Sequence, residues 1–324
     1  MSKSLGNTVD PNQVSNKLGA DILRLWVSSV DYQSDVRISD NILTQISENY
    51  RKIRNTLRFL LGNLNGFNPY EDQVEFGQLN ELDQFALIRL NRMAERVLKA
   101  YEKYEFHVVY QSIHHFCAVE LSAFYLDIIK DRLYASAPND AGRKAAQSVL
   151  YDALMSITKL MAPILPYTAD EVWKFIPGTE LPSVQMSEFP AIRTAYYNDT
   201  LESKWNRFID IRDEALKALE EARQGKVIGN SLSAALHLYP TAETREVLSQ
   251  LSELDQLFIV SAVYVHGEEE SAPDSANKHM AVEVEVADGE KCERCWIVTP
   301  EVGQSQEHPT LCKRCAAVVE TLEL

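Results

Sequence analysis

Hydrophobic positions recur at steps of three and four residues through most of the first 200 residues of the chain. Between Ser39 and Gly62, one such stripe is formed by Leu43, Ile46, Tyr50, Ile53, Leu57 and Leu60. The period resumes after Leu79, on Leu90, Met93, Val97, Tyr101 and Tyr104, and continues over about residues 108–131 and 141–160. This spacing places apolar side chains on one side of an α-helix. Four such helices in series predict a helical bundle.

Local signals mark where several helices begin. Asp10 is a predicted N-cap with Pro11 at the first helical position, and Gly19 marks a second start. Two prolines interrupt the fourth helix of the bundle in the segment MAPILPYTADEVW. Thr168 and Glu171 follow them with the spacing of a capping box, which predicts that a short helix begins there.

The pattern changes after the bundle. A proline-marked linker covers residues 176–193, and a further long helix is predicted over about residues 201–224. Three short runs have the character of β-strands, namely residues 234–239, 258–265 and 280–287. The last run alternates valines with glutamates, as expected for a half-buried strand. These runs predict a small mixed α/β module.

Composition restricts the class of protein. The 324 residues are 45% hydrophobic and 24% charged, which fits a cored, largely helical chain and not a disordered one. No apolar run approaches the roughly 20 residues that a membrane-spanning helix needs, and the first residues lack the apolar core of a secretory signal. We therefore expect a cytoplasmic protein without a membrane span.

The charge balance limits how the chain can bind nucleic acid. The formal net charge is −15, with 32 Lys and Arg against 47 Asp and Glu. A protein of this charge does not hold nucleic acid through a general basic field, so any RNA contact must be local. Acidic residues are concentrated between Val265 and Glu290, and that stretch should repel a phosphate backbone.

The strongest chemical signal is a pair of CxxC sequences near the end of the chain. Cys292 and Cys295 are followed, after sixteen intervening residues, by Cys312 and Cys315. Two such knuckles bring four thiolates to one tetrahedral Zn²⁺, and a full shell of four sulfurs leaves no position for a reactive water. The pattern therefore predicts one structural zinc ion. The alternatives are two disulfides, a redox dithiol, or His308 in place of one sulfur.

The fifth cysteine and the residues around the first knuckle can be interpreted from their neighbours in the sequence. Cys117 is predicted to be a buried core thiol, and His114 and His115 beside it to be structural. Trp296 directly follows the first knuckle and Arg294 lies within it. An exposed indole beside a guanidinium can stack on an unpaired base, but the indole can equally pack over the zinc site.

The opening residues carry a second, weaker signal. A lysine between two serines and before a glycine, as at Ser2, Lys3 and Ser4, can place an ammonium and two hydroxyls against triphosphate oxygens. So short a string also occurs as a solvated terminus.

Several longer segments resemble one known family. MSKSLGN is similar to the end of the KMSKS signature of class I aminoacyl-tRNA synthetases. GADILRLWVSSVDYQSDVRISDNIL, YRKIRNTLRFLLGNL, SAFYLDIIKDRLY, MAPILPYTADEVW and CERCW…HPTLCKRC resemble the isoleucyl branch of that family. The resemblance runs in order over essentially all 324 residues. The paired zinc knuckles separate it from the valyl and leucyl branches.

The resemblance implies a function in tRNA aminoacylation. The family joins isoleucine to tRNA(Ile) through an aminoacyl-adenylate formed from ATP with Mg²⁺, and the resemblance gives Lys3 a role at the adenylation transition state, with Ser2 and Ser4 on the ATP phosphates. The bundle corresponds to the anticodon-binding domain, in which Arg51, Arg54 and Arg58 face a tRNA backbone, although each is individually more typical of a solvated helix face. The zinc module assists anticodon reading, which favours tRNA contacts for Arg294 and Trp296. A monomer is expected.

Two departures qualify this interpretation. The first lysine of the signature is missing, and nothing in the sequence resembles the HIGH signature, the nucleotide-binding sheet or the editing domain. We therefore expect the 324 residues to bind tRNA and zinc without catalysing the reaction alone. The alternatives are a free-standing zinc-stabilised RNA-binding or interaction protein, or a valyl- or leucyl-type relative.

The fold class expected is mainly α, a class Ia helical bundle followed by a small α/β module and a C-terminal four-cysteine zinc knuckle. The expected boundaries are a remnant of the KMSKS loop with connecting helices over residues 1–38, the anticodon-binding bundle over 39–197, a long helix with the mixed module over 198–287, and the knuckle over 288–324.

Overall fold

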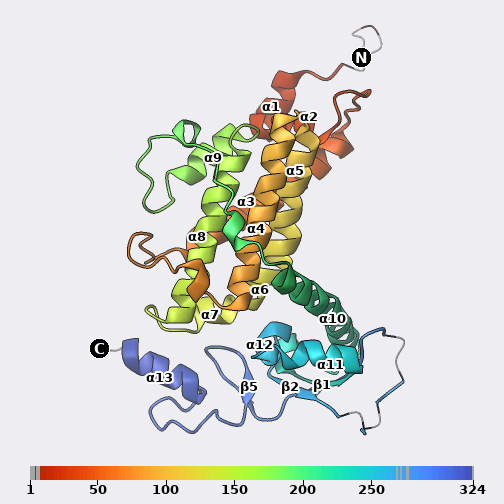
Figure 1. Ribbon diagram of the computed structural model, residues 1–324, viewed down its shortest axis with the longest axis vertical. Helices are drawn as coiled ribbons and strands as arrows, with labels where there is room; N and C mark the ends of the chain where they lie inside the picture. The colour runs from red at the N-terminus through yellow and green to blue at the C-terminus, as the bar shows by residue number, and fades with distance from the viewer. Residues whose placement is uncertain (1–3, 5–7, 268, 271, 275–276, 323–324) are drawn as a thin grey trace. The chain divides into compact units, whose positions relative to one another are not determined.

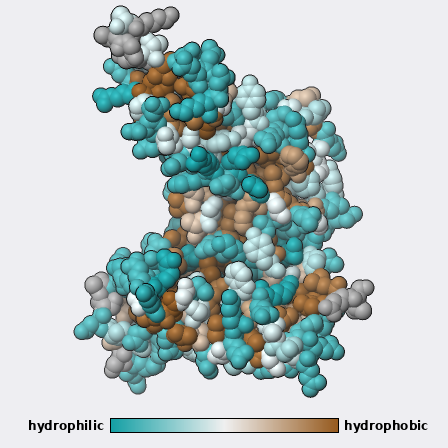
Figure 2. Space-filling view, turned by 180° about the vertical axis from the view of Figure 1, so that it is seen from behind, coloured by the Kyte–Doolittle hydropathy of each residue, from teal (hydrophilic) through white to brown (hydrophobic). Residues whose placement is uncertain are grey.

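The computed structural model describes residues 4, 8–267, 269–270, 272–274 and 277–322. The chain forms two compact units, one of residues 1–127 and 144–197 and the other of residues 128–143 and 198–324. The first unit consists mostly of helices, and the second unit contains one long helix, as the hydrophobic period of the sequence predicts (Figure 1). The face drawn in Figure 2 is mainly hydrophilic, with scattered hydrophobic patches. Among the described residues, no helix is both long and apolar enough to cross a membrane.

The first unit is helical. Its elements are α1 (Pro11–Leu18), α2 (Ala20–Ser29), α3 (Asp40–Asn63), the 3₁₀ turn η2 (Phe76–Gln78), α4 (Glu81–Glu102), α5 (Phe106–His115), the π-helix η3 (Phe116–Tyr125), α6 (Leu126–Ile128), which ends at the boundary of the unit, α8 (Ala141–Met161), which begins in the second unit, α9 (Pro166–Trp173), and the 3₁₀ turns η4 (Val184–Met186) and η5 (Thr194–Tyr196). Most positions of the predicted hydrophobic stripes are buried in the core, with Leu57, Leu60 and Val97 essentially inaccessible, whereas Tyr50 and Tyr101 are only partly buried. Burying such side chains provides the main driving force for the bundle.

The expected helix starts are confirmed in part. Asp10 caps α1 by accepting from the backbone N–H of Asn12 at 2.9 Å, and Gly19 is the N-cap of α2. The capping box at Thr168 and Glu171 is wrong. α9 begins at Pro166 without a side-chain cap, and Thr168 lies inside it. Tyr104, expected on the stripe of α4, lies beyond the end of that helix and is 65% exposed.

The third predicted helix of the bundle is not uniform. A helix is present over most of residues 108–131, but Phe116–Tyr125 form a π-helix between α5 and α6. A π-helix this long is rare, and π segments are frequent at functional sites. Its hydrophobic side is buried, and Tyr125 donates a 2.7 Å hydrogen bond to the buried Asp83 of α4.

The second unit combines helices with small sheets. Its elements are α7 (Lys130–Tyr134), α10 (Asp199–Gln224), the 3₁₀ turn η6 (Ser231–Ser233), β1 (Ala234–Pro240), α11 (Ala242–Ser249), α12 (Leu254–Phe258), β2 (Ala262–Val265), β3 (Met280–Val286), β4 (Glu290–Lys291), β5 (Val298–Thr299) and α13 (Lys313–Leu322). The first sheet has the order β2-β1-β3, with β1 parallel to β2 and antiparallel to β3.

All three predicted strands of this module are present, but the second begins later in the chain than predicted. The run over residues 258–265 forms a strand only from Ala262, because Leu254–Phe258 turn into the short helix α12. Phe258 is fully buried and packs edge-on against Phe208 of α10, with ring centroids 5.5 Å apart. An apolar run of this length fits a strand or a buried helical turn equally well, and here packing against α10 determined the outcome.

Candidate zinc centre and nucleic-acid surface

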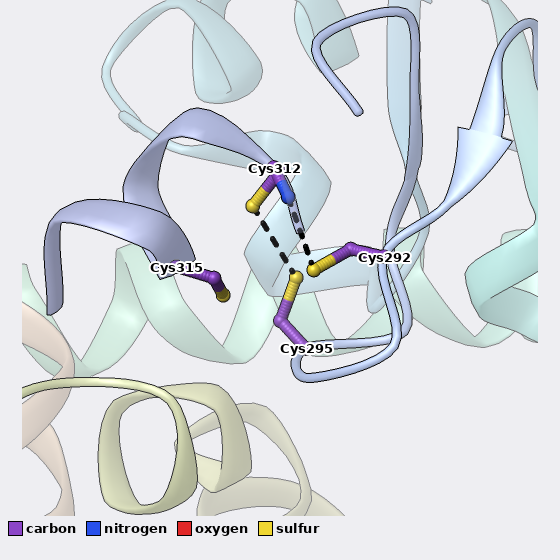
Figure 3. A group of neighbouring side chains, drawn as sticks. All are labelled: Cys292, Cys295, Cys312 and Cys315. Atoms are coloured by element: carbon purple, nitrogen blue, oxygen red, sulfur yellow. Dashed lines mark hydrogen bonds between the residues drawn. The ribbon is translucent and has the colours of Figure 1, made fainter. Parts of the chain in front are cut away.

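The four C-terminal cysteines come from two separate local structures. Cys292 and Cys295 occupy the turn between β4 and β5, and Cys312 and Cys315 lie at the start of α13 (Figure 3). Gly289 allows this hairpin to close. Its φ is +109°, and a β-carbon there would lie 2.3 Å from the carbonyl carbon of Thr299.

The sulfur atoms meet at zinc-binding spacing. All four Sγ atoms lie within 4.8 Å of one another, and those of Cys295 and Cys312 are 3.8 Å apart. Tetrahedral bonds of about 2.3 Å to one zinc ion imply sulfur atoms about 3.8 Å apart. The Cys312 N–H also donates to Cys292 Sγ at 3.3 Å, the kind of contact that stabilises a thiolate ligand (Figure 3).

The alternatives to zinc fit less well. All five cysteines of the chain are free thiols, so the two-disulfide arrangement is not present. His308 does not join the four sulfurs. It lies instead with the carboxylates of Glu307 and Glu320. Cys292, Cys312 and Cys315 are buried as a small core against Val302 and Leu311. Four converging sulfurs suit a structural ion with no open position.

The pKa values of the sulfurs are shifted in different directions. The Cys315 thiol donates to Cys295, which lowers the pKa of Cys295 to about 5 and raises the pKa of Cys315. Burial raises the pKa of Cys312. Arg294 lies near this group, with Nη1 3.7 Å from Cys315 Sγ. Four thiolates and a divalent cation would replace this arrangement on binding, with release of protons.

Arg294 also ties the knuckle to the rest of its unit. Its Nη1 donates to the carbonyl oxygen of Ala135, which follows α7. Arg314 makes a parallel attachment, because its Nη2 donates to Asp131 Oδ1 of α7 at 2.7 Å and its Nη1 pairs with Oδ2 at 2.5 Å. The guanidinium predicted to contact RNA therefore has a structural contact that the sequence did not indicate.

Trp296 is exposed to solvent beside this small core. Its side chain is 59% exposed, and the Nζ of Lys291 lies 5.0 Å from its ring centroid. Its backbone has φ +69°, a left-handed conformation that is unfavourable for a bulky residue. The backbone N–H donates to Cys292 O at 2.9 Å, so the knuckle turn itself enforces this conformation. The arrangement favours an available ring face over the packing interpretation.

The other predicted site residues have simpler surroundings. Arg51, Arg54 and Arg58 are all exposed on α3. Cys117 is fully buried, and desolvation raises its thiol pKa to about 12, as expected for an inert core residue. Burial also lowers the pKa of His114. Ser2 and Lys3 lie outside the described residues, and Ser4 is exposed.

The structure adds one surface that was not predicted. Five basic residues of α4 and its C-cap follow one another at steps of three, four, three and four residues, namely Arg89, Arg92, Arg96, Lys99 and Lys103. This is the same three-and-four spacing that marks the hydrophobic stripes, so the sequence does carry a signal for this surface. His115 lies beside it and pairs with Glu120 at 3.5 Å.

Comparisons with known proteins match this architecture in chain order. Residues 1–39 match the family of class I tRNA synthetases (I, L, M and V). Residues 83–238 match the anticodon-binding domain of tRNA ligase, and residues 289–318 match the zinc finger found in FPG and IleRS. The last match covers all four cysteines.

Individual relatives agree with the family models. An isoleucine–tRNA ligase of Brevibacillus brevis is 55% identical over 323 residues, which is 99% of this chain and 35% of that protein. A relative of the same name from Halalkalibacterium halodurans has the same identity and coverage. Among solved structures, a ternary complex of Agrobacterium radiobacter K84 agnB2 LeuRS with tRNA and LeuAMS has a TM-score of 0.46 and 21% identity, over 62% of this chain and 22% of that chain.

These matches place the chain among the class I tRNA synthetases, with the anticodon-binding domain and the zinc finger in their expected order. Within that class the chain belongs to the isoleucyl-tRNA synthetase family. It spans about a third of the length of the relatives it matches. The resemblance inferred from MSKSLGN to CKRC is thereby confirmed, and the zinc finger match favours the isoleucyl branch over the valyl and leucyl ones.

Proposed function

We propose that this chain binds the anticodon arm of tRNA(Ile) through its helical unit and its zinc module. The observation that carries the proposal is the conjunction of an anticodon-binding domain match with a four-sulfur site that displays an exposed indole. Single-stranded RNA loops are recognised by stacking unpaired bases on aromatic side chains and by hydrogen bonds to base edges. Trp296 supplies such a ring.

The proposal extends to the complete reaction of the family. In that reaction the protein joins L-isoleucine to tRNA(Ile) with ATP and Mg²⁺, as a monomer in the cytoplasm. Ser2, Lys3 and Ser4 would contact the ATP phosphates, with Lys3 stabilising charge at the adenylation transition state. Zinc holds Cys292, Cys295, Cys312 and Cys315 together and supplies no chemistry to the reaction.

The roles of individual residues follow from their chemistry. Trp296 would stack on an anticodon-loop base, and Arg294 would contact the same loop while also anchoring the knuckle. Arg51, Arg54 and Arg58 would lie along the phosphate backbone, because they are exposed on one helix with a spacing of three and four residues.

A salt titration separates base stacking from charge attraction. Trp296→Ala should weaken binding to tRNA(Ile) by about 1–3 kcal/mol with little change in salt dependence, because stacking involves no phosphate. Arg54→Ala should weaken cognate and non-cognate tRNA alike and reduce the salt slope by about one unit. If Trp296→Ala binds tRNA(Ile) normally while losing zinc or thermal stability, the indole is a packing residue.

A further inference from the structure

The zinc module brings together three further side chains that can bind a metal and that the proposed function does not use. Glu307 and His308 lie in the loop between β5 and α13, and Glu320 lies near the end of α13. One ligand atom of each, two carboxylate oxygens and an imidazole nitrogen in all, lies within 4.8 Å of the other two. The group is assembled from two separate elements, so the sequence pattern does not indicate it.

The four-cysteine site positions both of these elements. The His308 N–H donates to Ser305 Oγ at 3.2 Å, and the Leu311 N–H donates to the His308 carbonyl oxygen at 3.1 Å, so the backbone on either side of the imidazole is held in a turn. Leu311 packs against the small core of cysteines, and Cys315 lies in the first turn of the helix that carries Glu320. The three ligands therefore meet because the knuckle is folded.

Nothing in the described part of the chain accounts for the meeting of these side chains by pairing. Within that part, the side chains of Glu307, His308 and Glu320 take part in no hydrogen bond and no ion pair. Both glutamates are exposed, and His308 is half-buried. Two carboxylates at this separation repel each other, and a neutral imidazole does not offset their charge. A divalent cation would neutralise both carboxylates and accept the imidazole lone pair.

The imidazole distinguishes this group from a cluster of acidic side chains and narrows the choice of ion. Sites built only from oxygen suit Ca²⁺ and Mg²⁺, whereas a neutral imidazole nitrogen is a common ligand of Zn²⁺, Ni²⁺, Cu²⁺ and Fe²⁺. Three protein ligands leave at least one position for water, in contrast to the closed shell of four sulfurs. The donor set therefore suits an exchangeable transition-metal ion.

The spacing of the ligand atoms allows them to close around one ion. Nitrogen and oxygen ligands lie about 2.0–2.2 Å from Zn²⁺, which places the ligand atoms of a tetrahedron about 3.4 Å apart. The separations here are at most 4.8 Å, so a contraction of little more than about 1 Å suffices. Rotation about the side-chain bonds of two exposed glutamates provides this movement without a change in the backbone.

We propose that Glu307, His308 and Glu320 form a second metal site, which binds a divalent transition-metal ion of the Zn²⁺ type more weakly than the four cysteines do. The ion joins the end of α13 to the loop that precedes this helix. Binding is weaker because two of the ligands are exposed and must be ordered, and because thiolates are the better ligands for Zn²⁺. This site is independent of RNA binding and therefore of the proposed function.

Calorimetric titration with Zn²⁺ tests the proposal on the full 324-residue chain already carrying one Zn²⁺ on its four cysteines. Wild type should bind a second equivalent. Glu320→Gln should weaken this second step by more than about 100-fold, because loss of even an outer contact to a metal ligand costs about 10–100-fold. Glu301→Gln changes an exposed glutamate of the same loop in the same way, and it should leave the second step unchanged.

A titration with Co²⁺ identifies the donor atoms of the second site. Co²⁺ bound to thiolates absorbs strongly through sulfur-to-metal charge transfer, whereas Co²⁺ bound to nitrogen and oxygen absorbs weakly. Co²⁺ added to the zinc-loaded chain should bind without a sulfur band, and His308→Gln should abolish this binding while Zn²⁺ remains on the cysteines. His279→Gln, which changes another half-buried histidine of the second unit, should retain it.

Several outcomes would overturn the proposal. A second equivalent that persists in both Glu320→Gln and His308→Gln would place the binding elsewhere, and absence of a second equivalent in wild type would remove the site. A sulfur band in the second step would mean that Co²⁺ had displaced Zn²⁺ from the cysteines. If His308→Gln loses the first Zn²⁺ as well, Glu320→Gln decides, because selective loss of its second equivalent supports the site and retention contradicts it.

Discussion

Asp21 accepts two hydrogen bonds from Thr168, one from the backbone N–H at 2.8 Å and one from the hydroxyl at 2.5 Å. The Thr168 hydroxyl is also 2.9 Å from the hydroxyl of Tyr50 on α3. Both Asp21 and Thr168 are buried. The contact joins α2, which follows the opening segment that matches class I synthetases, to the first turn of α9 within the anticodon-binding match. The Asp21 carboxylate of α2 thus accepts a hydrogen bond from a backbone N–H in the first turn of α9, which has no capping side chain of its own.

This pair predicts a stability effect. Asp21→Ala should reduce the free energy of unfolding of the first unit by about 2–3 kcal/mol, because it leaves the N–H and hydroxyl of Thr168 without their charged acceptor. Chemical denaturation followed by circular dichroism measures this change. The exposed Asp35→Ala is the control and should cost under about 0.5 kcal/mol. Equal effects of the two variants would mean that the buried pair contributes little.

Asp72 predicts a pH dependence. Hydrogen bonds from the backbone N–H of Asn68 and from Lys144 Nζ, each 2.8 Å long, lower the pKa of its carboxyl below the ordinary value of 3.8. A lowered pKa stabilises the folded state fully above the ordinary value, and the stabilisation is lost as pH falls through the lower folded value. Asp72→Asn should therefore be less stable than wild type at neutral pH, with the difference shrinking below pH 3.8.

Thermal melts of both proteins across acidic pH test the Asp72 prediction. Asp35→Asn serves as the control, and its difference from wild type should remain small throughout. A gap between wild type and Asp72→Asn that widens on acidification would contradict the sign of the argument.

The zinc site predicts a stoichiometry. The purified chain should contain about one tightly held Zn²⁺, since four thiolates complete a tetrahedral shell. Cys312→Ser should lose the metal and unfold the knuckle while most of the helical circular dichroism remains, because the bundle has its own core. Cys117→Ala removes a thiol outside the site and should retain one zinc ion per chain. Metal analysis that finds no zinc in a folded protein with four titratable C-terminal thiols would refute the assignment.

Arg294 predicts a difference between metal binding and RNA binding. Because its guanidinium contacts Cys315 Sγ and the Ala135 carbonyl, Arg294→Ala should weaken zinc binding by about 10–100-fold, as loss of an outer contact to a ligand commonly does. Competition with a chromogenic chelator measures the affinity, and the exposed Lys313→Ala is the control. Unchanged zinc affinity together with weaker tRNA binding would place Arg294 in the RNA surface alone.

The sequence by itself determined the features that depend on neighbours a few residues apart. The three-and-four period located α3, α4 and α8, Asp10 and Pro11 gave the start of α1, and the two CxxC spacings predicted a four-sulfur site. Such signals are reliable because helix faces, caps and knuckles are built from residues close in the chain. The family resemblance added the order of the domains.

Only the tertiary structure decided the features that depend on distant partners. Thr168 binds Asp21 across 147 residues, and Arg294 reaches Ala135 across 159. The π-helix and the helical turn at Phe258 likewise lie in apolar runs whose local pattern would fit a regular α-helix or strand. The π-helix contacts α4 through Tyr125 and Asp83, and Phe258 packs against Phe208 of α10. The physical reason is that burial and hydrogen-bond satisfaction are properties of the whole fold, so they can override a local preference of a few tenths of a kcal/mol per residue.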